Sequence, residues 1–335
     1  MNQVLKAFAV PTAISLVVLF AVFIWGGWHA LWIAILLTIL EVTLSFDNAV
    51  VNARILTQMD EKWQKRFLTW GILIAVFGTR LVLPIVIVAI SVMMNPLEVL
   101  SMALNDAEHY GELLHSAHVA IASFGGAFLL MVSLKYFFDS AKDVHWIKSV
   151  EEVLARWGRF EAIEIGLTLI SLLIISSIVG DAGTILYSGI IGILVFVIMQ
   201  GIASSFSAKA TGAIAGGSVA LFLYLNVLDA AFSLDGVVGA FAISNQIPVI
   251  VAGLGIGAYF VRSLTIYFVQ KKTLDTLVFL EHGAHWAILG LSVAMLASIF
   301  AEVPEVITGL VGLVFVGTAA VSSIRLLKKD KAKEA

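Results

Sequence analysis

Stretches of about 20 apolar residues follow one another along most of this chain, and they constrain its fold more than any other feature. A helix needs roughly 20 such residues to cross the hydrocarbon core of a bilayer. Of the 335 residues, 60% are hydrophobic and 13% are charged, whereas a soluble domain is roughly half apolar and a quarter charged. We therefore expect an all-α, polytopic bundle of transmembrane helices that has the lipid bilayer as its solvent.

Ten segments satisfy this length rule. They lie at about 7–25, 30–54, 67–94, 118–137, 161–180, 184–203, 211–243, 247–270, 284–302 and 305–324. Pro84 predicts a kink in segment 67–94, and segment 211–243 is long enough to be tilted, unwound or partly re-entrant. No signal-peptide cleavage pattern follows the first segment, so we expect it to be retained as a span.

Lysine and arginine are confined to alternate connections between these segments. With the N-terminus placed inside, 17 of the 20 basic residues lie in the inner segments and none lies in the outer ones. The other three are Lys135, near the inner end of a span, and Arg80 and Arg262, which lie within spans. The positive-inside rule then predicts ten spans in the cell inner (plasma) membrane, with both termini cytoplasmic.

Three polar patterns occur twice, in the same order. Leu40-Glu41-x-x-x-Ser45-x-Asp47 returns as Leu228-Asp229-x-x-x-Ser233-x-Asp235, Gly71 with Arg80 returns as Gly253 with Arg262, and His115 with His118 returns as His282 with His285. The two copies of each pattern are five spans apart, and because five is odd they cross the membrane in opposite directions. Such an inverted repeat is typical of secondary transporters, which bind substrate near the midplane. We expect 1–180 to form the first repeat and 181–335 the second, with a short basic tail.

Glu41 lies near the bilayer centre, about 13 residues into the second predicted span. An intramembrane carboxylate is costly unless it is paired, protonated or bound to a cation. Oxygen donors suit Mg²⁺, Ca²⁺ or Mn²⁺. We therefore predict a divalent-metal site, with Glu41 and Asp229 meeting near the midplane and Asp47 and Asp235 displaced toward opposite sides. The predicted ligands are Glu41, Asp47, Asn48, Asp229 and Asp235, with Ser45 and Ser233 as accessory groups.

The sequence allows two alternative roles for each of the remaining duplicated residues. Arg80 and Arg262 are counter-ions or gate charges, or they hold the bundle together through structural ion pairs with the acids. The pairs His115/His118 and His282/His285 each share one helical face. They are entry and exit ligands or proton carriers, or they are packing residues at the membrane interface.

The run Glu41-Val-Thr-Leu-Ser-Phe-Asp47-Asn48 resembles the acidic signature of the TerC family of integral membrane proteins. Leu280-Glu-His-Gly-Ala-His285 is similar to a stretch of a TerC-related branch of unknown function, and the resemblance covers about 30–325. It implies a fold like that of the LysE exporter superfamily, Mn²⁺ export in several members, and the same five ion-binding positions. The second copy departs from the family pattern, with Asp229 instead of Glu and Gly236 instead of Asn.

Together these features predict a secondary transporter that exports a divalent metal cation, with Mn²⁺ favoured, by alternating access and proton exchange. The alternatives are a non-transporting membrane scaffold in a metal, tellurite or envelope-stress complex, and a carrier of an amino acid or anion. We find no nucleophile–base pair or phosphate loop and expect neither an enzyme nor a resident cofactor. The net charge of −3 gives no reason to expect nucleic acid, and homo-oligomerisation is left open.

Overall fold

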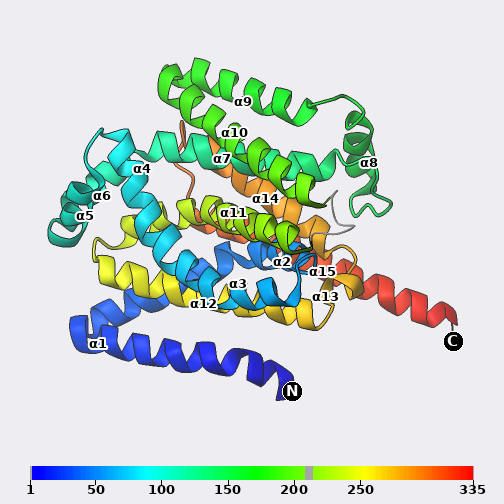
Figure 1. The fold of residues 1–335 in the computed structure, drawn as a ribbon, viewed down its shortest axis with the longest axis horizontal. Helices are drawn as coiled ribbons and strands as arrows, with labels where there is room; N and C mark the ends of the chain where they lie inside the picture. Colours follow the sequence, from blue (N-terminus) through cyan, green and yellow to red (C-terminus); the bar gives the residue numbers. More distant parts are fainter. Residues whose placement is uncertain (1, 208–213, 335) are drawn as a thin grey trace.

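The computed structural model describes residues 2–207 and 214–334, which fold into helices joined by short connections, with no strand in those ranges (Figure 1). The elements are α1 (Asn2–Leu44), α2 (Phe46–Leu56), α3 (Glu61–Leu73), the π-helix η1 (Ile74–Val82), α4 (Leu83–Ser91), α5 (Pro96–Asn105), α6 (Ala107–Ser116), α7 (His118–Phe137), α8 (Lys148–Trp157), α9 (Ile163–Val179), α10 (Ala182–Ser207), α11 (Ile214–Ile243), α12 (Ile247–Gln270), α13 (Thr273–Thr276), α14 (Leu280–Ala297) and α15 (Glu305–Glu334).

Within these ranges, seven helices are long and apolar enough to cross a membrane. They are Phe8–Leu44, Glu61–Ile90, His118–Phe137, Ala182–Ile202, Gly217–Phe241, Ile247–Gln270 and Ile307–Lys329, and α9 is a shorter apolar helix. Their flanks expose large apolar side chains, which is what a helix requires where it faces lipid rather than water. The predicted all-α membrane bundle is therefore confirmed in this coarse form.

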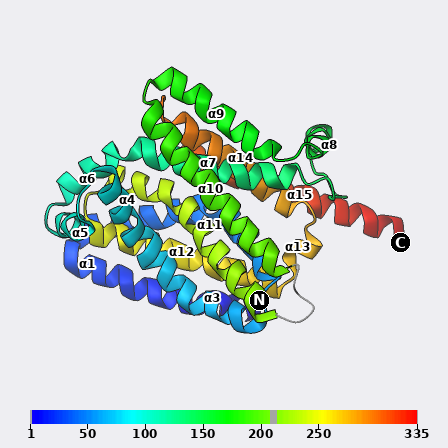
Figure 2. The same ribbon diagram turned by 45° about the horizontal axis from the view of Figure 1, so that its top comes forward.

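A break at Gly27 divides α1 into two helical runs. Gly27 has φ 69° and ψ −162°, in a region that glycine adopts without the steric penalty of a Cβ. The second run turns back alongside the first (Figures 1 and 2). The last part of α1, followed by α2, thus runs back toward the side of the molecule where the N-terminus lies.

The backbone of the two long predicted spans differs from the kink expected at Pro84 and the interruption expected in 211–243. Segment 67–94 is α-helical to Leu73, π-helical from Ile74 to Val82 and α-helical again from Leu83. Pro84 stands in the first turn of α4, where its missing N–H costs least. The irregularity is therefore the π-helix that contains Arg80, a kind of segment frequent at functional sites. Helix α11 is unbroken from Ile214 to Ile243, and 211–213 lie outside the described residues.

Helices from the two halves of the sequence interleave in the bundle. Helix α1 packs along α12, and α7 packs against both α10 and α14. Gly125 and Gly126 on α7 lie against Met295 and Leu296 of the α14 segment, and the Ser292 hydroxyl donates to the Gly126 carbonyl at 2.9 Å. Small residues and interhelical hydrogen bonds of this kind hold membrane helices together in the absence of a hydrophobic effect between them.

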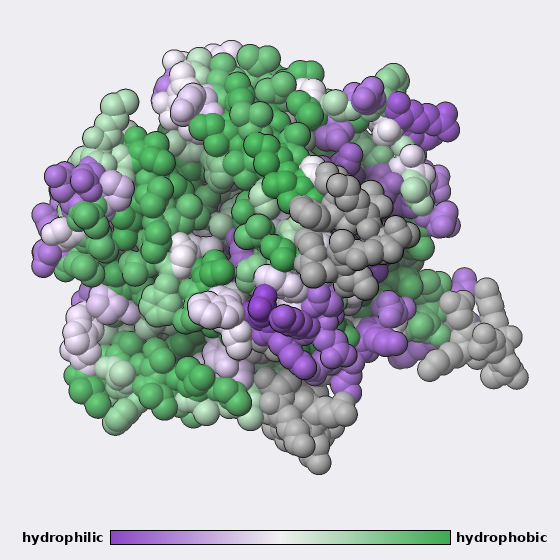
Figure 3. Space-filling model, in the orientation of Figure 1, coloured by the Kyte–Doolittle hydropathy of each residue, from purple (hydrophilic) through white to green (hydrophobic). Residues whose placement is uncertain are grey.

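The two ends of the bundle differ in what they carry. Both termini, α8 and α13 lie at one end, and α5 and α6 lie at the other (Figures 1 and 2). On the face shown in Figure 3, apolar residues cover much of the surface, and hydrophilic residues gather over α5 and α6, near α8 and over the start of α3. The end with both termini is called the basic end below, because Lys62, Arg156, Lys272 and Lys328 belong to elements that finish or start there.

Candidate functional site

An ion pair joins Glu41, near the end of α1, to Arg80 on the π-helix. Arg80 Nη2 contacts Glu41 Oε1, and both side chains are 2% exposed. The Ser45 hydroxyl, at the break between α1 and α2, donates to the same carboxylate oxygen at 2.9 Å. The charge of Glu41 is therefore neutralised by an arginine of a neighbouring span, so its burial costs less free energy than burial of an unpaired carboxylate.

An equivalent ion pair joins Asp229 on α11 to Arg262 on α12. Arg262 Nη2 lies 3.2 Å from Asp229 Oδ2, with side chains 4% and 11% exposed. Arg262 also donates to the Phe67 carbonyl at 3.0 Å. The Ser233 hydroxyl donates to the backbone carbonyl of Asp229 at 2.7 Å, so it does not serve the carboxylate as Ser45 does. In each half, the acid of the first repeated pattern thus pairs with the arginine of the second.

A second acid follows six residues after each paired one, and neither forms an ion pair with a basic side chain in the described part of the chain. Asp47 is 2% exposed and accepts a hydrogen bond from the Asn48 N–H at 3.0 Å. The buried Oδ2 of Asp235 has no hydrogen-bond partner. In each copy of the repeated pattern, the first carboxylate is therefore neutralised by an arginine, and the second has no ion-pair partner among the described residues.

Three asparagine oxygens near these acids are also buried without a donor. They are the Oδ1 atoms of Asn48 and Asn52 on α2 and of Asn226 on α11. Buried polar atoms in folded proteins nearly always have a partner, because an unsatisfied one costs about 1–3 kcal/mol. All of these atoms are oxygen acceptors, so the partner that would satisfy them is a donor or a cation.

Two contacts define how α1–α2 and α11 run past each other in antiparallel directions (Figures 1 and 2). A Cβ placed on Gly236 would lie 3.3 Å from Glu41 Oε2, and the Asp60 N–H donates to the Ser218 hydroxyl at 3.0 Å. Residues 41–56 are helical apart from the break at Ser45, so residues counted from the contact of Glu41 with Gly236 can be matched along the two helices. Asp47 is then level with Asp229, and Glu41 is level with Asp235.

This register places the four acids along the helix pair. Glu41 faces Gly236, which is seven residues, or about 10 Å, from Asp229 along the axis of α11. By this count the acids form two levels about 9 Å apart along the helices, one with Glu41 and Asp235 and the other with Asp47 and Asp229. Each level combines the paired acid of one half with the unpaired acid of the other. Among the described residues, no three His, Asp or Glu side chains gather in a preformed metal cage.

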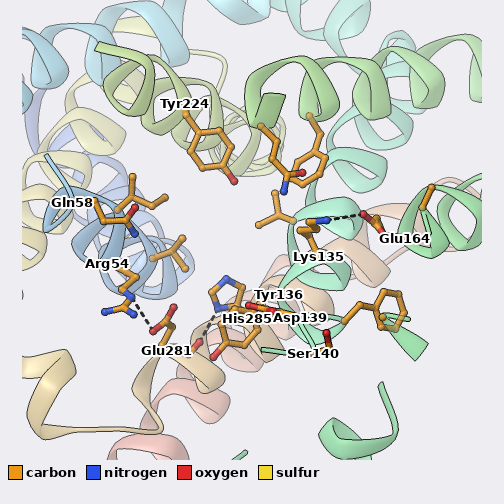
Figure 4. A pocket seen from close by; sticks show the side chains of 18 of the residues that line it. Arg54, Gln58, Lys135, Tyr136, Asp139, Ser140, Glu164, Tyr224, Glu281 and His285 are labelled. Carbon is orange, nitrogen blue, oxygen red and sulfur yellow. Dashed lines mark hydrogen bonds and ion pairs between the residues drawn. The ribbon is translucent and has the colours of Figure 1, made fainter. Parts of the chain in front are cut away.

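A cavity of about 760 Å³, called the vestibule below, opens at the basic end of the bundle. Its wall includes Arg54, Tyr136, Tyr224 and His285, which Figure 4 shows around one open space. Arg54 pairs with Glu281 at 3.3 Å, and Lys135 pairs with Glu164 at 3.2 Å. Two more wall carboxylates carry excess negative charge, Asp139 and Glu161, so the vestibule favours cations.

The inner end of the vestibule approaches the donor-free oxygens. Val51 and Tyr224 line the vestibule, and each lies within two residues of an asparagine with a free Oδ1, Asn52 and Asn226 respectively. The level of Asp47 and Asp229 follows within about one further helical turn. The vestibule, the asparagines and the two acidic levels therefore succeed one another along the α2–α11 pair.

The duplicated histidines lie at opposite ends of the antiparallel α7–α14 pair. His118 Nε2 lies 3.2 Å from the Ser298 hydroxyl, and His115 is exposed with its ring 6.3 Å from that of His118. His285 stacks on Tyr136 with ring centroids 3.5 Å apart, and its Nδ1 lies 2.8 Å from the Glu281 carbonyl. His285 borders the vestibule, whereas His118 contacts Ser298 and His282 contacts Glu151.

Glu151 on α8 is a buried residue that the sequence patterns did not single out. His282 Nδ1 lies 2.7 Å from one carboxylate oxygen, and Trp286 Nε1 donates to the other at 2.9 Å. Burial by itself would raise the pKa of Glu151, but the hydrogen bonds and charge of His282, with those from Trp286 and the Ile147 N–H, lower it to about 2. No local pattern marks this acid, because its side-chain partners come from α14.

The fold and the paired acids define the class as a helical membrane protein with a duplicated acid–arginine core. The sequence matches the family described as "Protein of unknown function (DUF475)" over residues 46–330, and the chain belongs to that family. This match overturns the resemblance to the TerC family, which rested on the run 41–48 and the stretch 280–285. No curated protein and no solved structure matches the chain.

Proposed function

We propose that this protein is a secondary transporter of a divalent metal cation that uses hard oxygen ligands. One observation carries the proposal: buried oxygens without donors and carboxylates without counter-ions follow one another along the α2–α11 pair, starting at an acidic vestibule. Carboxylate and amide oxygens are ligands of Mg²⁺, Ca²⁺ and Mn²⁺. The preference for Mn²⁺ and for export rested on the overturned resemblance, so the donor set now supports only this class of cation.

The proposed topology has ten crossings in a five-plus-five inverted repeat. Counting the two runs of α1 on either side of Gly27 as separate crossings, and adding α9 and α14, raises the seven long apolar helices to ten. The positive-inside rule places the basic end, with both termini, in the cytoplasm. The repeated acid–arginine pairs support the symmetry, because each half forms the same contact from the same two patterns.

In the proposed mechanism, the cation enters through the vestibule and binds first at the level of Asp47 and Asp229. It then moves to the level of Glu41 and Asp235, from which it is released on the opposite side of the membrane. The inverted repeat relates the two levels by symmetry, so each can face one side of the membrane in turn, as alternating access requires. Asp47 and Asp235 take the cation, because neither is occupied by an arginine. Arg80 and Arg262 hold the other two acids when the cation is away, and proton exchange at the unpaired acids supplies the coupling.

The rival function is a membrane scaffold that transports nothing. The neutralisation of Glu41 and Asp229 by arginines favours it, because buried ion pairs of this kind also occur as purely structural contacts. The two functions differ in what Asp47 and Asp235 do: a scaffold has no use for a buried acid without a counter-ion.

The test is cation flux in liposomes containing the purified protein. Mn²⁺, Mg²⁺ and Ca²⁺ uptake is compared for the wild type, Asp47→Asn, Asp235→Asn and the control Glu98→Gln, which removes an exposed carboxylate on α5. We expect flux of at least one cation in the wild type and the control, and its loss in both aspartate variants at matched protein levels. Wild-type liposomes without flux, or equal flux in all four, would refute the proposal.

A further inference from the structure

Helix α8 has three distinct faces, although it is only 10 residues long. One face carries Glu151, which is 1% exposed and bound to α14. At about 100° per residue, Val150, Val153 and Trp157 form a stripe on a second face. Lys148, Glu152 and Arg156 form a third face, roughly opposite the stripe. The helix is therefore docked on the bundle by one side, with an apolar and a polar face left free.

The apolar stripe has no cover in the described structure. Val150, Val153 and Trp157 are 40%, 38% and 45% exposed, and Phe160, just beyond the helix, is 66% exposed. Three large apolar side chains in one row, with an exposed phenylalanine after them, are unusual on a water-facing surface. Glu151 prevents the helix from rolling to bury them, because its carboxylate is held by His282 and Trp286.

The position of α8 indicates what covers the stripe. It connects the end of the membrane helix α7 to the start of the apolar helix α9. At the basic end it crosses the direction of these helices at a steep angle (Figures 1 and 2). A helix of about 15 Å is too short to cross a bilayer. Since α7 and α9 end in the boundary of the bilayer, their connector is placed at that boundary.

The side chains of α8 suit that boundary. Tryptophan and phenylalanine beside lysine and arginine are typical of helices that lie in the membrane interface. Lys148 and Arg156 lie on the polar face, and Arg159 follows the helix. Their charges complement the anionic headgroups of a cytoplasmic leaflet, which the long side chains reach while their stems remain apolar.

We propose that α8 is an interfacial membrane helix, with the stripe Val150, Val153 and Trp157 inserted at the boundary between headgroups and acyl chains. The bilayer is the partner of this surface. Gly158 and Phe160 also line the vestibule, so the inserted helix holds part of the vestibule wall at the membrane surface. This inference does not rest on the proposed transport function.

Site-directed spin labelling tests the proposal directly, because the chain contains no cysteine and each added one is the only label site. Val153→Cys places a nitroxide on the stripe, and Glu152→Cys places the matched control on the polar face. Both are compared in liposomes containing anionic lipid. We expect the label at 153 to collide more with lipid-soluble oxygen than with a water-soluble nickel complex, and the label at 152 to show the reverse.

Two results would overturn the proposal. Equal access of the nickel complex to both labels would place the stripe in water. Protection of the label at 153 from both reagents would place it against protein, such as a second copy of the chain. If Val153→Cys fails to fold, Val150→Cys reports on the same stripe, and the same outcomes decide.

Discussion

Glu41 and Arg80 form an ion pair in which each side chain is only 2% exposed. Loss of one member of such a pair leaves the other charged and buried, at a cost of about 3–5 kcal/mol. We expect Arg80→Met to lower the stability in detergent micelles by about that amount, and Glu41→Gln/Arg80→Met to regain much of it. Thermal unfolding measures both. Arg54→Met is the control, because its pair with Glu281 is half exposed and worth about 1 kcal/mol or less. If the double variant loses as much stability as Arg80→Met and Glu41→Gln lose in sum, this account is contradicted.

Gly71 provides room for the arginine of the other half. A Cβ at position 71 would meet Arg262 Nη1 and the Phe67 ring, so Gly71→Ala is expected to displace Arg262 from Asp229 and lower the melting temperature. Gly166→Ala, on α9, is the matched control, since nothing lies within 4 Å of its added Cβ and the substitution favours a helix by roughly 0.5–1 kcal/mol. The prediction fails if both alanines change the melting temperature alike.

The contact of α8 with α14 should depend on pH through Glu151. Its pKa is lowered from 4.5 to about 2, so its contribution to stability is fully present above about 4.5 and is lost as pH falls toward about 2. A nitroxide at Ser149→Cys should become mobile over that range. Adding Glu151→Gln should leave the label mobile at all pH values, while Glu152→Gln should not. The same acid transition in the Glu151→Gln protein would exclude this residue as its cause.

The proposed orientation predicts which cysteines react from outside the cell. Ser101 on α5 and Lys328 on α15 are exposed at opposite ends of the bundle. In the cysteine-free background, a thiol reagent that cannot cross membranes should label Ser101→Cys in intact cells, and Lys328→Cys only after permeabilisation. Labelling of both in intact cells, or of position 328 alone, would refute a cytoplasmic basic end.

The long apolar segments are a local property, and they were sufficient to predict a helical membrane bundle. Backbone groups in lipid must bond within their own segment, so a long apolar run has few alternatives to a helix. The separate segments 7–25 and 30–54 predicted a connection that contains Gly27, but nothing in the sequence predicted the π-helix around Arg80. Their conformations depend on the packing around them, and for Arg80 also on the ion pair with Glu41.

The sequence by itself singled out the duplicated acids and arginines, because a charged residue in an apolar segment stands out without any knowledge of its neighbours. Only the tertiary structure decided the partners: Glu41 with Arg80, and Asp229 with Arg262. It also set the register of the α1–α2 segment against α11, through contacts such as that of Glu41 with Gly236. The buried role of Glu151 depended on such contacts too, because its side-chain partners His282 and Trp286 lie more than 100 residues away along the chain.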